Sequence, residues 1–422
     1  MISNDGGAPR TWMASHTHRS WLLGQAQRLF DFFRSSLGED GRFADLDDDG
    51  RPVQFRDATQ SVPGQRLLTV ARAVHCYSLG ELLGVPGCAS IVERGLRALW
   101  DEHRDPKSGG YVQIVDATGP VDGTKSAYGH AFVLLAASSA LSAGHDARGL
   151  YEDVRAVIDE HFWSEQDGAA REAFAGDWDE LEPYRGANAN MHLCEAFLAA
   201  SDATGDEALA ERAAGIAQLL IDRHARAHGW LLPEHYDTAW QPILGYNRDR
   251  TDYDLFRPYG ATIGHMLEWS RLLPSAWIAT GKSDAWMPQA AVELFAAAVR
   301  LGWDNEHGGL SFTVDWDGSP ANPDHYWWPI AEGISASAFL LHLTAEPLYE
   351  EWYRKFWDFA GFHLIDYARG GWYPELGPTN RRKVSLWYGK PDLYHALQSC
   401  LLPLLTPAPS LAGALKDLPP VT

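Results

Sequence analysis

Cysteine and positive charge are both scarce in this chain of 422 residues. Its four cysteines lie far apart and form no CxxC pair, so we expect reduced, buried thiols. Lysine and arginine number 35 against 56 acidic residues, which gives a net charge of −21. A nucleic acid would require a basic face. We therefore expect no nucleic-acid partner, and the same charge argues against binding to an anionic membrane.

Long hydrophobic runs are also missing. No apolar stretch reaches membrane-spanning length, and the opening residues MISNDGGAPRTWMASHTH contain no apolar h-region. A cytoplasmic protein without membrane contact is the expectation. The glycines lack the GxGxxG and GxxxxGK[ST] spacings that cradle phosphates, and no local signature of a serine or cysteine nucleophile is present. Aromatic residues, by contrast, are plentiful, with 18 Trp and 16 Tyr available for a large core and for a ligand pocket.

A repeated turn organises the whole chain. Six times a helical stretch runs into a polar turn built on glycine, at intervals of 58 to 80 residues, which is about the length of two helices and a short hairpin. Six helix pairs in series close most economically into a ring. The repeat therefore predicts an all-α fold, an (α/α)6 barrel of twelve helices with short hairpins in the long connections. The six glycines are Gly41, Gly110, Gly168, Gly229, Gly309 and Gly371.

Apolar residues at three- and four-residue spacing predict where the helices lie. The twelve ranges are 18–37, 66–83, 89–103, 125–142, 146–162, 187–204, 206–224, 260–280, 284–303, 328–344, 348–362 and 391–405. Every second helix is rich in small apolar residues and suits an inner ring, whereas the others carry more charge and suit the outside. One catalytic domain over 17–406 is expected, with flexible tails at 1–16 and 407–422. The longest connection, 235–259, is long enough to form a lid.

Polar side chains occur within the first two turns of each predicted inner helix, and in a closed ring those ends meet at one mouth. Two of these residues are histidines from opposite sides of the ring, His265 and His395. Glu268 follows His265 by one turn, where it would orient the imidazole and favour its protonated form. The pattern predicts an acid–base pair that works near neutral pH. The other members are Arg66, Arg72, Lys125, Tyr128, Asn188, His192, Trp327, Trp328 and Glu332.

Other chemistries remain to be weighed against this pair. Neither histidine has HExxH spacing, so we expect no metal and no other cofactor, although residues distant in sequence could still converge on an ion. A glycoside hydrolase would need two facing carboxylates, for which Glu268 and Glu332 are the candidates. A non-catalytic binding protein would need an exposed apolar helix or a patterned tail. Cofactor-free proton transfer is the simplest reading.

Four segments resemble the N-acylglucosamine 2-epimerase superfamily, and within it the branch of aldose–ketose isomerases that act on mannose and related sugars. They are RPYGATIGHMLEW (257–269), NANMH (188–192), WWPIAEG (327–333) and DLYHAL (392–397). The resemblance extends over residues 17 to 405, and its most specific part is the GHxxEW segment. It implies an (α/α)6 barrel and a metal-free isomerisation through a cis-enediol.

The resemblance also implies roles for individual residues. The two essential histidines of the family correspond to His265 and His395. Residues that hold the sugar hydroxyls correspond to Arg72, Tyr128, Asn188 and His192, and further pocket positions to Arg257, Glu268, Trp328 and Glu332. The expected substrate is a monosaccharide, D-mannose/D-fructose first and D-lyxose/D-xylulose second, bound by a monomer or homodimer. A 2-epimerase acting on an N-acylhexosamine or a disaccharide, and an isomerase of a sulfonated sugar, are the alternatives.

Overall fold

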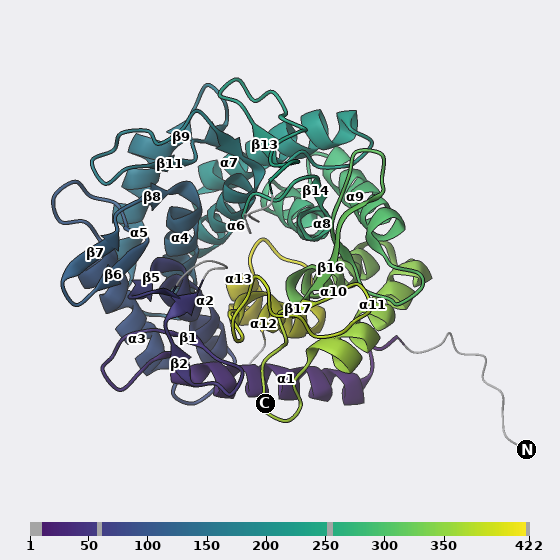
Figure 1. Ribbon diagram of the computed structural model, residues 1–422, viewed down its shortest axis with the longest axis horizontal. Coiled ribbons are helices and arrows are strands. Elements are labelled where there is room, and N and C mark those ends of the chain that lie inside the picture. The colour runs from purple at the N-terminus through teal and green to yellow at the C-terminus, as the bar shows by residue number, and fades with distance from the viewer. Residues whose placement is uncertain (1–10, 57–60, 251–255, 419–422) are drawn as a thin grey trace, which may run out of the picture.

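The helices form two concentric rings in the computed structural model, which describes residues 11–56, 61–250 and 256–418 (Figure 1). Each inner helix contacts the next one along the chain, and the last contacts the first, so that the ring is closed. The inner helices are α2 (Leu67–Leu82), α4 (Ala127–Ser142), α6 (Ala187–Thr204), α8 (Ile263–Ala279), α10 (Trp327–Thr344) and α12 (Tyr394–Leu401).

An outer helix packs on each inner one, and α1 from the beginning of the chain covers α12 at its end. Most residues of α4 and α10 are buried, as their small apolar side chains predict, whereas outer helices such as α5 bury one face. The (α/α)6 barrel expected from the repeat is confirmed. The outer helices are α1 (His16–Phe33), α3 (Cys88–Ala98), α5 (Arg148–Val157), α7 (Glu207–Ala217), α9 (Trp286–Gly302) and α11 (Pro347–Phe359).

Helix boundaries differ from the predicted ones chiefly in the outer ring. Four outer helices end in a π-helical turn, over Leu99–His103, Ile158–Phe162, Gln218–Ala225 and Ala360–Leu364. Two short 3₁₀ turns, Arg34–Ser36 and Leu402–Leu404, follow α1 and α12. The apolar periodicity continues through all of these turns, which is why the sequence does not separate them from the helices.

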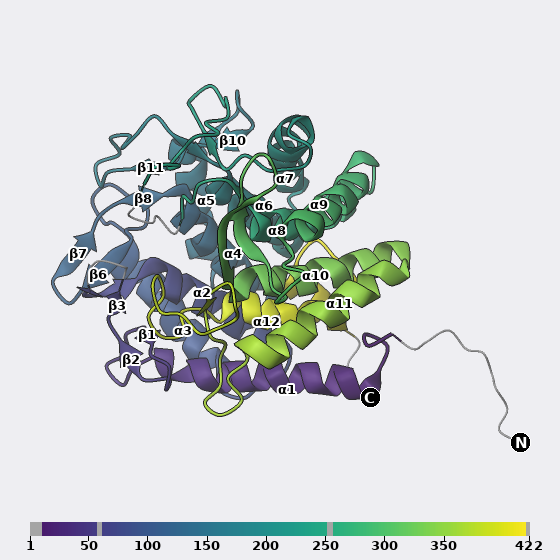
Figure 2. The ribbon, with the colours of Figure 1, turned by 45° about the vertical axis from the view of Figure 1, so that its right-hand side comes forward.

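The six repeat glycines all have positive φ, between 62° and 97°. Glycine adopts this left-handed backbone without the steric cost that other residues meet, which explains why the turn always contains it. Short antiparallel hairpins follow the turns, and the largest sheet has the strand order β14-β15-β16-β17. A strand immediately precedes each of α2, α4, α6, α8 and α10. The hairpins thus gather around the N-terminal ends of the inner helices (Figure 2).

The strands are short. They comprise β1 (Asp45–Leu46), β2 (Pro52–Val53), β3 (Phe55–Arg56), β4 (Ser61–Val62), β5 (Gln65–Arg66), β6 (Ile114–Asp116), β7 (Gly119–Asp122), β8 (Lys125–Ser126), β9 (Trp163–Ser164), β10 (Ala169–Ala170), β11 (Ala173–Phe174), β12 (Arg185–Gly186), β13 (His235–Tyr236), β14 (Ala261–Thr262), β15 (Ser311–Val314), β16 (Pro320–Tyr326) and β17 (Glu375–Leu376).

The segment after the last inner helix corrects one expectation. Residues 407–422 were expected to form a flexible tail, but α13 (Leu411–Lys416) packs against α2, α4 and α6. Two buried apolar side chains, Ala412 and Leu415, hold it there, and the Ser410 hydroxyl caps its first turn. Residues 11–16 of the predicted tail 1–16 are also packed on the barrel, because the Trp12 N–H donates to Glu350 at 2.6 Å and Met13 is buried. Residues 1–10 and 419–422 lie outside the described residues, and the single domain over 17–406 stays a prediction.

The four cysteines are free and buried, as predicted. Within the described ranges, no helix combines the length and the apolar character needed to cross a bilayer.

Replacing the buried Leu415 with alanine tests whether α13 belongs to the core. Leu415→Ala is expected to lower the free energy of unfolding by about 2–4 kcal/mol, because it removes buried methyl groups and leaves a cavity. Leu418→Ala is the matched control, since Leu418 is 46% exposed, and its effect should stay within about 0.5 kcal/mol. Chemical denaturation of both variants checks this. Equal stabilities would mean that α13 is not part of the core.

Candidate active site

Equivalent positions of the inner helices build the site in layers. Residues two, six and nine of a helix share one face, because they are separated by four and three residues. The second positions hold Leu68, Tyr128, Asn188, Gly264, Trp328 and His395, and the sixth hold Arg72, Phe132, His192, Glu268 and Glu332. The ninth hold His75, Leu135, Glu195, Arg271 and Ser335.

A cavity of about 1080 Å³, including the part open to solvent, lies at the N-terminal ends of the inner helices. It brings together most of the residues predicted from the sequence. Phe256 and Pro258, from the connection expected to form a lid, also line it, whereas residues 251–255 of that connection lie outside the described part. The predicted residues in the lining are Arg66, Arg72, Tyr128, Asn188, His192, His265, Glu268, Trp327, Trp328 and His395.

His265 is held by a carboxylate that sequence reasoning missed. Its Nδ1 lies 2.9 and 3.0 Å from the two carboxylate oxygens of Glu234, which belongs to the connection just before β13. The predicted partner, Glu268, makes no hydrogen bond to His265; its ion-pair partners are Arg271 and His192, at 3.7 and 3.8 Å. The prediction that Glu268 orients His265 is therefore wrong, because Glu234 already occupies the ring nitrogen that faces away from the cavity.

His395 is held in the same way by a different glutamate. Its Nδ1 lies 2.7 Å from Oε1 of Glu332. An ionised carboxylate can only accept hydrogen bonds, so each Nδ1 donates and each neutral imidazole keeps its lone pair on Nε2. Two bases with the same tautomer thus line one cavity. Glu332 was predicted to hold substrate, but it is buried and both of its oxygens are bonded to protein groups, so it acts behind His395 instead.

Trp328 packs beside both histidines. Its ring centroid is 5.2 Å from that of His265 and 5.6 Å from that of His395. The ring passes over Gly264, where a Cβ atom would come within 2.1 Å of it. A glycine directly before His265 is therefore what allows the indole to pack beside both imidazoles.

Below the histidines, the guanidinium of Arg271 joins glutamates from three helices. Its nitrogens lie 3.2 Å from Glu195, 3.3 Å from Glu332 and 3.7 Å from Glu268. Burial is the largest single influence and raises the pKa of Glu195 and of Glu332. The charge of Arg271, together with hydrogen bonds from His192 and Tyr394 to Glu195 and from His395 to Glu332, outweighs it and holds both pKa values below their usual range. These two carboxylates are therefore ionised at neutral pH.

Glu268 differs from them. Neither of its oxygens has a hydrogen-bond partner among the described residues, and it is completely buried at the cavity wall. Burial, together with the negative charge of Glu332, raises the pKa of Glu268 well above its usual range. Burial likewise lowers the pKa of His192 to about 4, so this imidazole is neutral at pH 7. Glu268 thus presents a protonated carboxyl group that can donate a hydrogen bond into the cavity.

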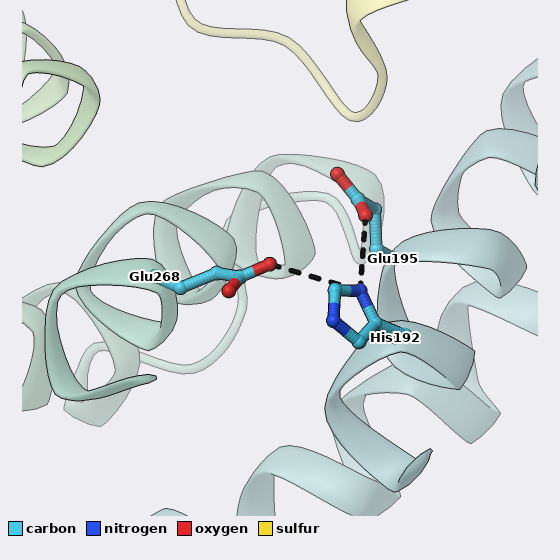
Figure 3. A group of neighbouring side chains, drawn as sticks. All are labelled: His192, Glu195 and Glu268. Atoms are coloured by element: carbon cyan, nitrogen blue, oxygen red, sulfur yellow. Dashed lines mark ion pairs between the residues drawn. The ribbon is translucent and has the colours of Figure 1, made fainter. Parts of the chain in front are cut away.

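Two groups of side chains have the composition of a metal site, His192 with Glu195 and Glu268 (Figure 3), and Glu268 with Glu332 and His395. Within each group the ligand atoms lie within 4.8 Å of one another. Carboxylates and imidazoles are suitable ligands for a divalent ion. Here, however, the ionised carboxylates already have a cation, the guanidinium of Arg271, and the third is protonated. The donor set fits an arginine-centred network better than a metal.

Arg72 and Tyr128 form a second polar wall. An Arg72 nitrogen lies 2.9 Å from the Tyr128 hydroxyl and another 3.2 Å from Asp392. The side-chain Oδ1 of Asn188 is buried at the cavity without a hydrogen-bond partner in the described structure. Arg257, by contrast, does not line the cavity. It lies 2.5 Å from Glu182 and over the ring of Tyr184, since those groups attract the guanidinium outward.

The missed residues had weak signals in the sequence. Glu234 follows the repeat glycine Gly229 by five residues, and Glu172 and Glu375 follow theirs by four. This recurrence could have drawn attention to Glu234. Arg271 and Glu195 lie one turn deeper than the predicted layer, and only the spacing of three residues from Glu268 and His192 points to them.

Known proteins share this sequence and architecture. Residues 41–399 match the N-acylglucosamine 2-epimerase (GlcNAc 2-epimerase) family. A D-mannose isomerase of Thermobifida fusca is 44% identical over 96% of this chain and 99% of its own length. A D-mannose isomerase of Pseudomonas cannabina pv. alisalensis is 42% identical over 99% and 100%. A crystal structure of a D-mannose isomerase superposes with a TM-score of 0.85 at 30% identity, covering 94% of this chain and 99% of that one.

Changing Glu234 tests whether it is the partner of His265. Glu234→Gln is expected to lower kcat by about 10²–10⁴-fold, because an amide lacks the charge and does not impose the Nδ1–H tautomer. KM should change little, since Glu234 does not line the cavity. Steady-state kinetics with D-mannose, the aldose expected from the sequence, measures kcat and KM. The control is Glu172→Gln, because Glu172 follows the equivalent glycine turn but has no histidine partner. An equal loss of kcat in Glu172→Gln would refute the assignment of Glu234.

Proposed function

Because the chain belongs to the N-acylglucosamine 2-epimerase family, we propose that it is an aldose–ketose isomerase that interconverts D-mannose and D-fructose, with D-lyxose and D-xylulose as a second pair. One observation carries the proposal: two histidines, each held at Nδ1 by its own glutamate, present Nε2 to one cavity. The names of the full-length relatives support the choice of sugar.

In the proposed reaction, proton transfer converts the open-chain aldose into a ketose. Nε2 of His395 removes the proton from C2, the electrons of the C2–H bond form the C1–C2 double bond, and O1 becomes the oxygen of a cis-enediol. The same imidazole then returns the proton to C1, while the hydroxyl at C2 loses its proton and becomes the ketone. No electron leaves or enters the sugar, so the step needs no redox cofactor.

His265, oriented by Glu234, moves the proton between O2 and O1 and opens the sugar ring beforehand. Negative charge develops on these oxygens when C2 loses its proton, and positioned donors stabilise it. Arg72 and the protonated carboxyl group of Glu268 are the hydrogen-bond donors that stabilise this negative charge. Tyr128, Asn188 and His192 hold the remaining hydroxyls. Arg257 and Glu332 are not assigned to the substrate, because Arg257 pairs with Glu182 outside the cavity and Glu332 binds His395 and Arg271.

The alternatives fit the cavity less well. A 2-epimerase on an N-acylhexosamine or a disaccharide needs room for a second group, but Trp327, Trp328 and Trp387 all stand in the cavity wall. A sulfonated sugar would call on cations such as Arg185 or Lys383, which do not line the cavity and are engaged by Glu180 and Asp324. A glycoside hydrolase needs two carboxylates that face the substrate, and Glu332 lies behind His395.

Three further features belong to the proposal. We expect the isomerase to work without a metal, because Arg271 supplies the positive charge among the buried glutamates. We expect it in the cytoplasm, where free buried cysteines stay reduced. It acts on its monosaccharide as a monomer or a homodimer.

Proton NMR of EDTA-treated protein with D-mannose in D2O tests the reaction. Fructose is expected to form, either with deuterium at C1 or with the proton carried over from C2, in a ratio that reports how readily the base exchanges its proton with solvent. Glucose in place of fructose would establish the epimerase alternative. Loss of turnover after EDTA, restored by a divalent ion, would contradict the metal-free reaction.

Alanine variants test the roles of the two histidines. His395→Ala and His265→Ala should each lower kcat by about 10²–10⁴-fold or more, because each removes a positioned acid–base group. Deuterium exchange at C2 should disappear with His395→Ala, since that variant lacks the base that contacts carbon. Near-normal turnover by either folded variant, checked by circular dichroism, would contradict the mechanism.

A further inference from the structure

A second cavity, the lower cavity, lies on the other side of the Arg271 network, toward the C-terminal ends of the inner helices. Its volume is about 530 Å³, including the part open to solvent, and in the described structure it shares no lining residue with the active-site cavity. Four inner helices each contribute one residue to the active-site cavity and another, three residues later on the same face, to the lower cavity. These pairs are Arg72 and His75, His192 and Glu195, Glu268 and Arg271, and His395 and Gln398.

The C-terminal segment closes the lower cavity from below. Residues 408–412 and Ala414 line it, and α13 packs against three inner helices. The Ser275 hydroxyl donates to the carbonyl of Ala408 at 2.9 Å, and the Ser410 hydroxyl donates to Asp202 at 2.5 Å, which ties the segment to α8 and α6. Polar groups inside the lower cavity are thus shielded from bulk solvent and depend on partners within it.

Two polar side chains of the lower cavity have hydrogen-bonding atoms that no protein group satisfies. Gln398 is 1% exposed, and neither its amide nitrogen nor its amide oxygen has a partner among the described residues. His75 is 3% exposed; its Nδ1 lies 2.7 Å from the Ser139 hydroxyl, whereas its Nε2 has no partner in the described part of the chain. Leaving a buried polar group unpaired costs about 1–3 kcal/mol, so a partner inside the cavity is strongly favoured.

The wall of the lower cavity determines which molecule suits these groups. Arg271 and Glu195 both line it, 3.2 Å apart, so an ion of either sign would meet one charge of its own sign. The Gln398 amide both donates and accepts. Burial lowers the pKa of His75 to about 4, so its imidazole is neutral at pH 7, and its Nε2 donates or accepts according to the tautomer. A small neutral molecule that both donates and accepts meets all these conditions, and water is that molecule.

We propose that the lower cavity is a binding site for ordered water, and that Gln398 is a positioning residue that supports the Arg271 network through this water. The water bridges the Gln398 amide and Nε2 of His75, and it contacts the network from the side opposite the active-site cavity. It thereby fixes the guanidinium that holds Glu332, the glutamate that orients His395. The effect on catalysis rests on the proposed function, whereas the binding of water does not.

Crystal structures of the wild-type protein and of Gln398→Met test the water site directly. The wild-type structure is expected to show a water molecule within hydrogen-bond distance of both the Gln398 amide and Nε2 of His75. Methionine has a similar volume but no amide, so the variant should lose this water. A direct hydrogen bond between Gln398 and His75, an ion in the lower cavity, or no ordered water there would each overturn the proposal.

Steady-state kinetics with D-mannose tests the positioning role. Gln398→Met is expected to lower kcat by about tenfold, the size of one hydrogen bond to a charged group. KM should stay near the wild-type value, because Gln398 does not line the active-site cavity. The control is Leu402→Met, a volume-conserving change in the wall of the same lower cavity that removes no polar group. Its kcat should match the wild type, and an equal loss there would overturn the role of Gln398.

A double variant shows whether Gln398 and His75 act through the same water. Gln398→Met/His75→Phe should lose no more kcat than the more impaired single variant, because either change alone removes the water. Losses that multiply would overturn the shared site. Thermal unfolding checks the fold of each variant, and Gln398→Leu replaces Gln398→Met if the latter is unfolded.

The two kinds of measurement separate this inference from the proposed function. Failure of the wild-type protein to convert D-mannose would overturn the proposed reaction, and the crystal structures would still decide whether the lower cavity binds water. An unchanged kcat in Gln398→Met, in a protein that does convert D-mannose, would overturn the positioning role alone.

Discussion

A single buried guanidinium, that of Arg271, determines the arrangement beneath the site. It lies among glutamates of α6, α8 and α10, and so connects three inner helices at one depth of the barrel. By keeping Glu332 ionised it provides the carboxylate that orients His395, and the charge of Glu332 in turn helps to keep Glu268 protonated. Buried charges of this kind are stable only when every partner is present. The proposed acid–base chemistry of the cavity and the packing beneath it therefore both depend on Arg271.

The repeat explains how such different chemistry arises from similar helices. The five inner helices from α2 to α10 share the face formed by their second, sixth and ninth residues, and a position that carries phenylalanine in α4 carries arginine in α2 and glutamate in α8. No helix contains a complete site. The closed ring brings the six sets of residues together, and the hairpins before the helices add partners such as Glu234 and Asp45 from outside the ring. The side chains that line the cavity therefore come from nearly the whole chain, from Phe33 to His395.

Much of this could be read from the sequence, and the failures have a common cause. The repeat predicted the barrel, and the range 187–204 was predicted to the residue for α6, because helix periodicity and glycine turns are local properties. The positions of His265, His395, Arg72 and Asn188 followed from the same local rule. The pairing of side chains did not follow from this rule. Glu268 is near His265 in sequence, yet the imidazole binds Glu234, 31 residues away. Arg257 and α13 were misjudged for the same reason, since their neighbours come from other repeats.

The contact between α1 and α12 has a consequence for how the protein is made. α1, from the beginning of the chain, packs on α12 near its end. Phe30 of α1 also contacts Tyr77 of α2, but the part of α1 that packs on α12 is covered only after nearly the whole polypeptide has been synthesised. Such distant contacts slow folding and leave apolar surface exposed in the meantime. A chain released before residue 394 is made would form an incomplete ring of helices, with exposed apolar surfaces at both ends. Nascent chains of this barrel should therefore depend on chaperones until translation is complete.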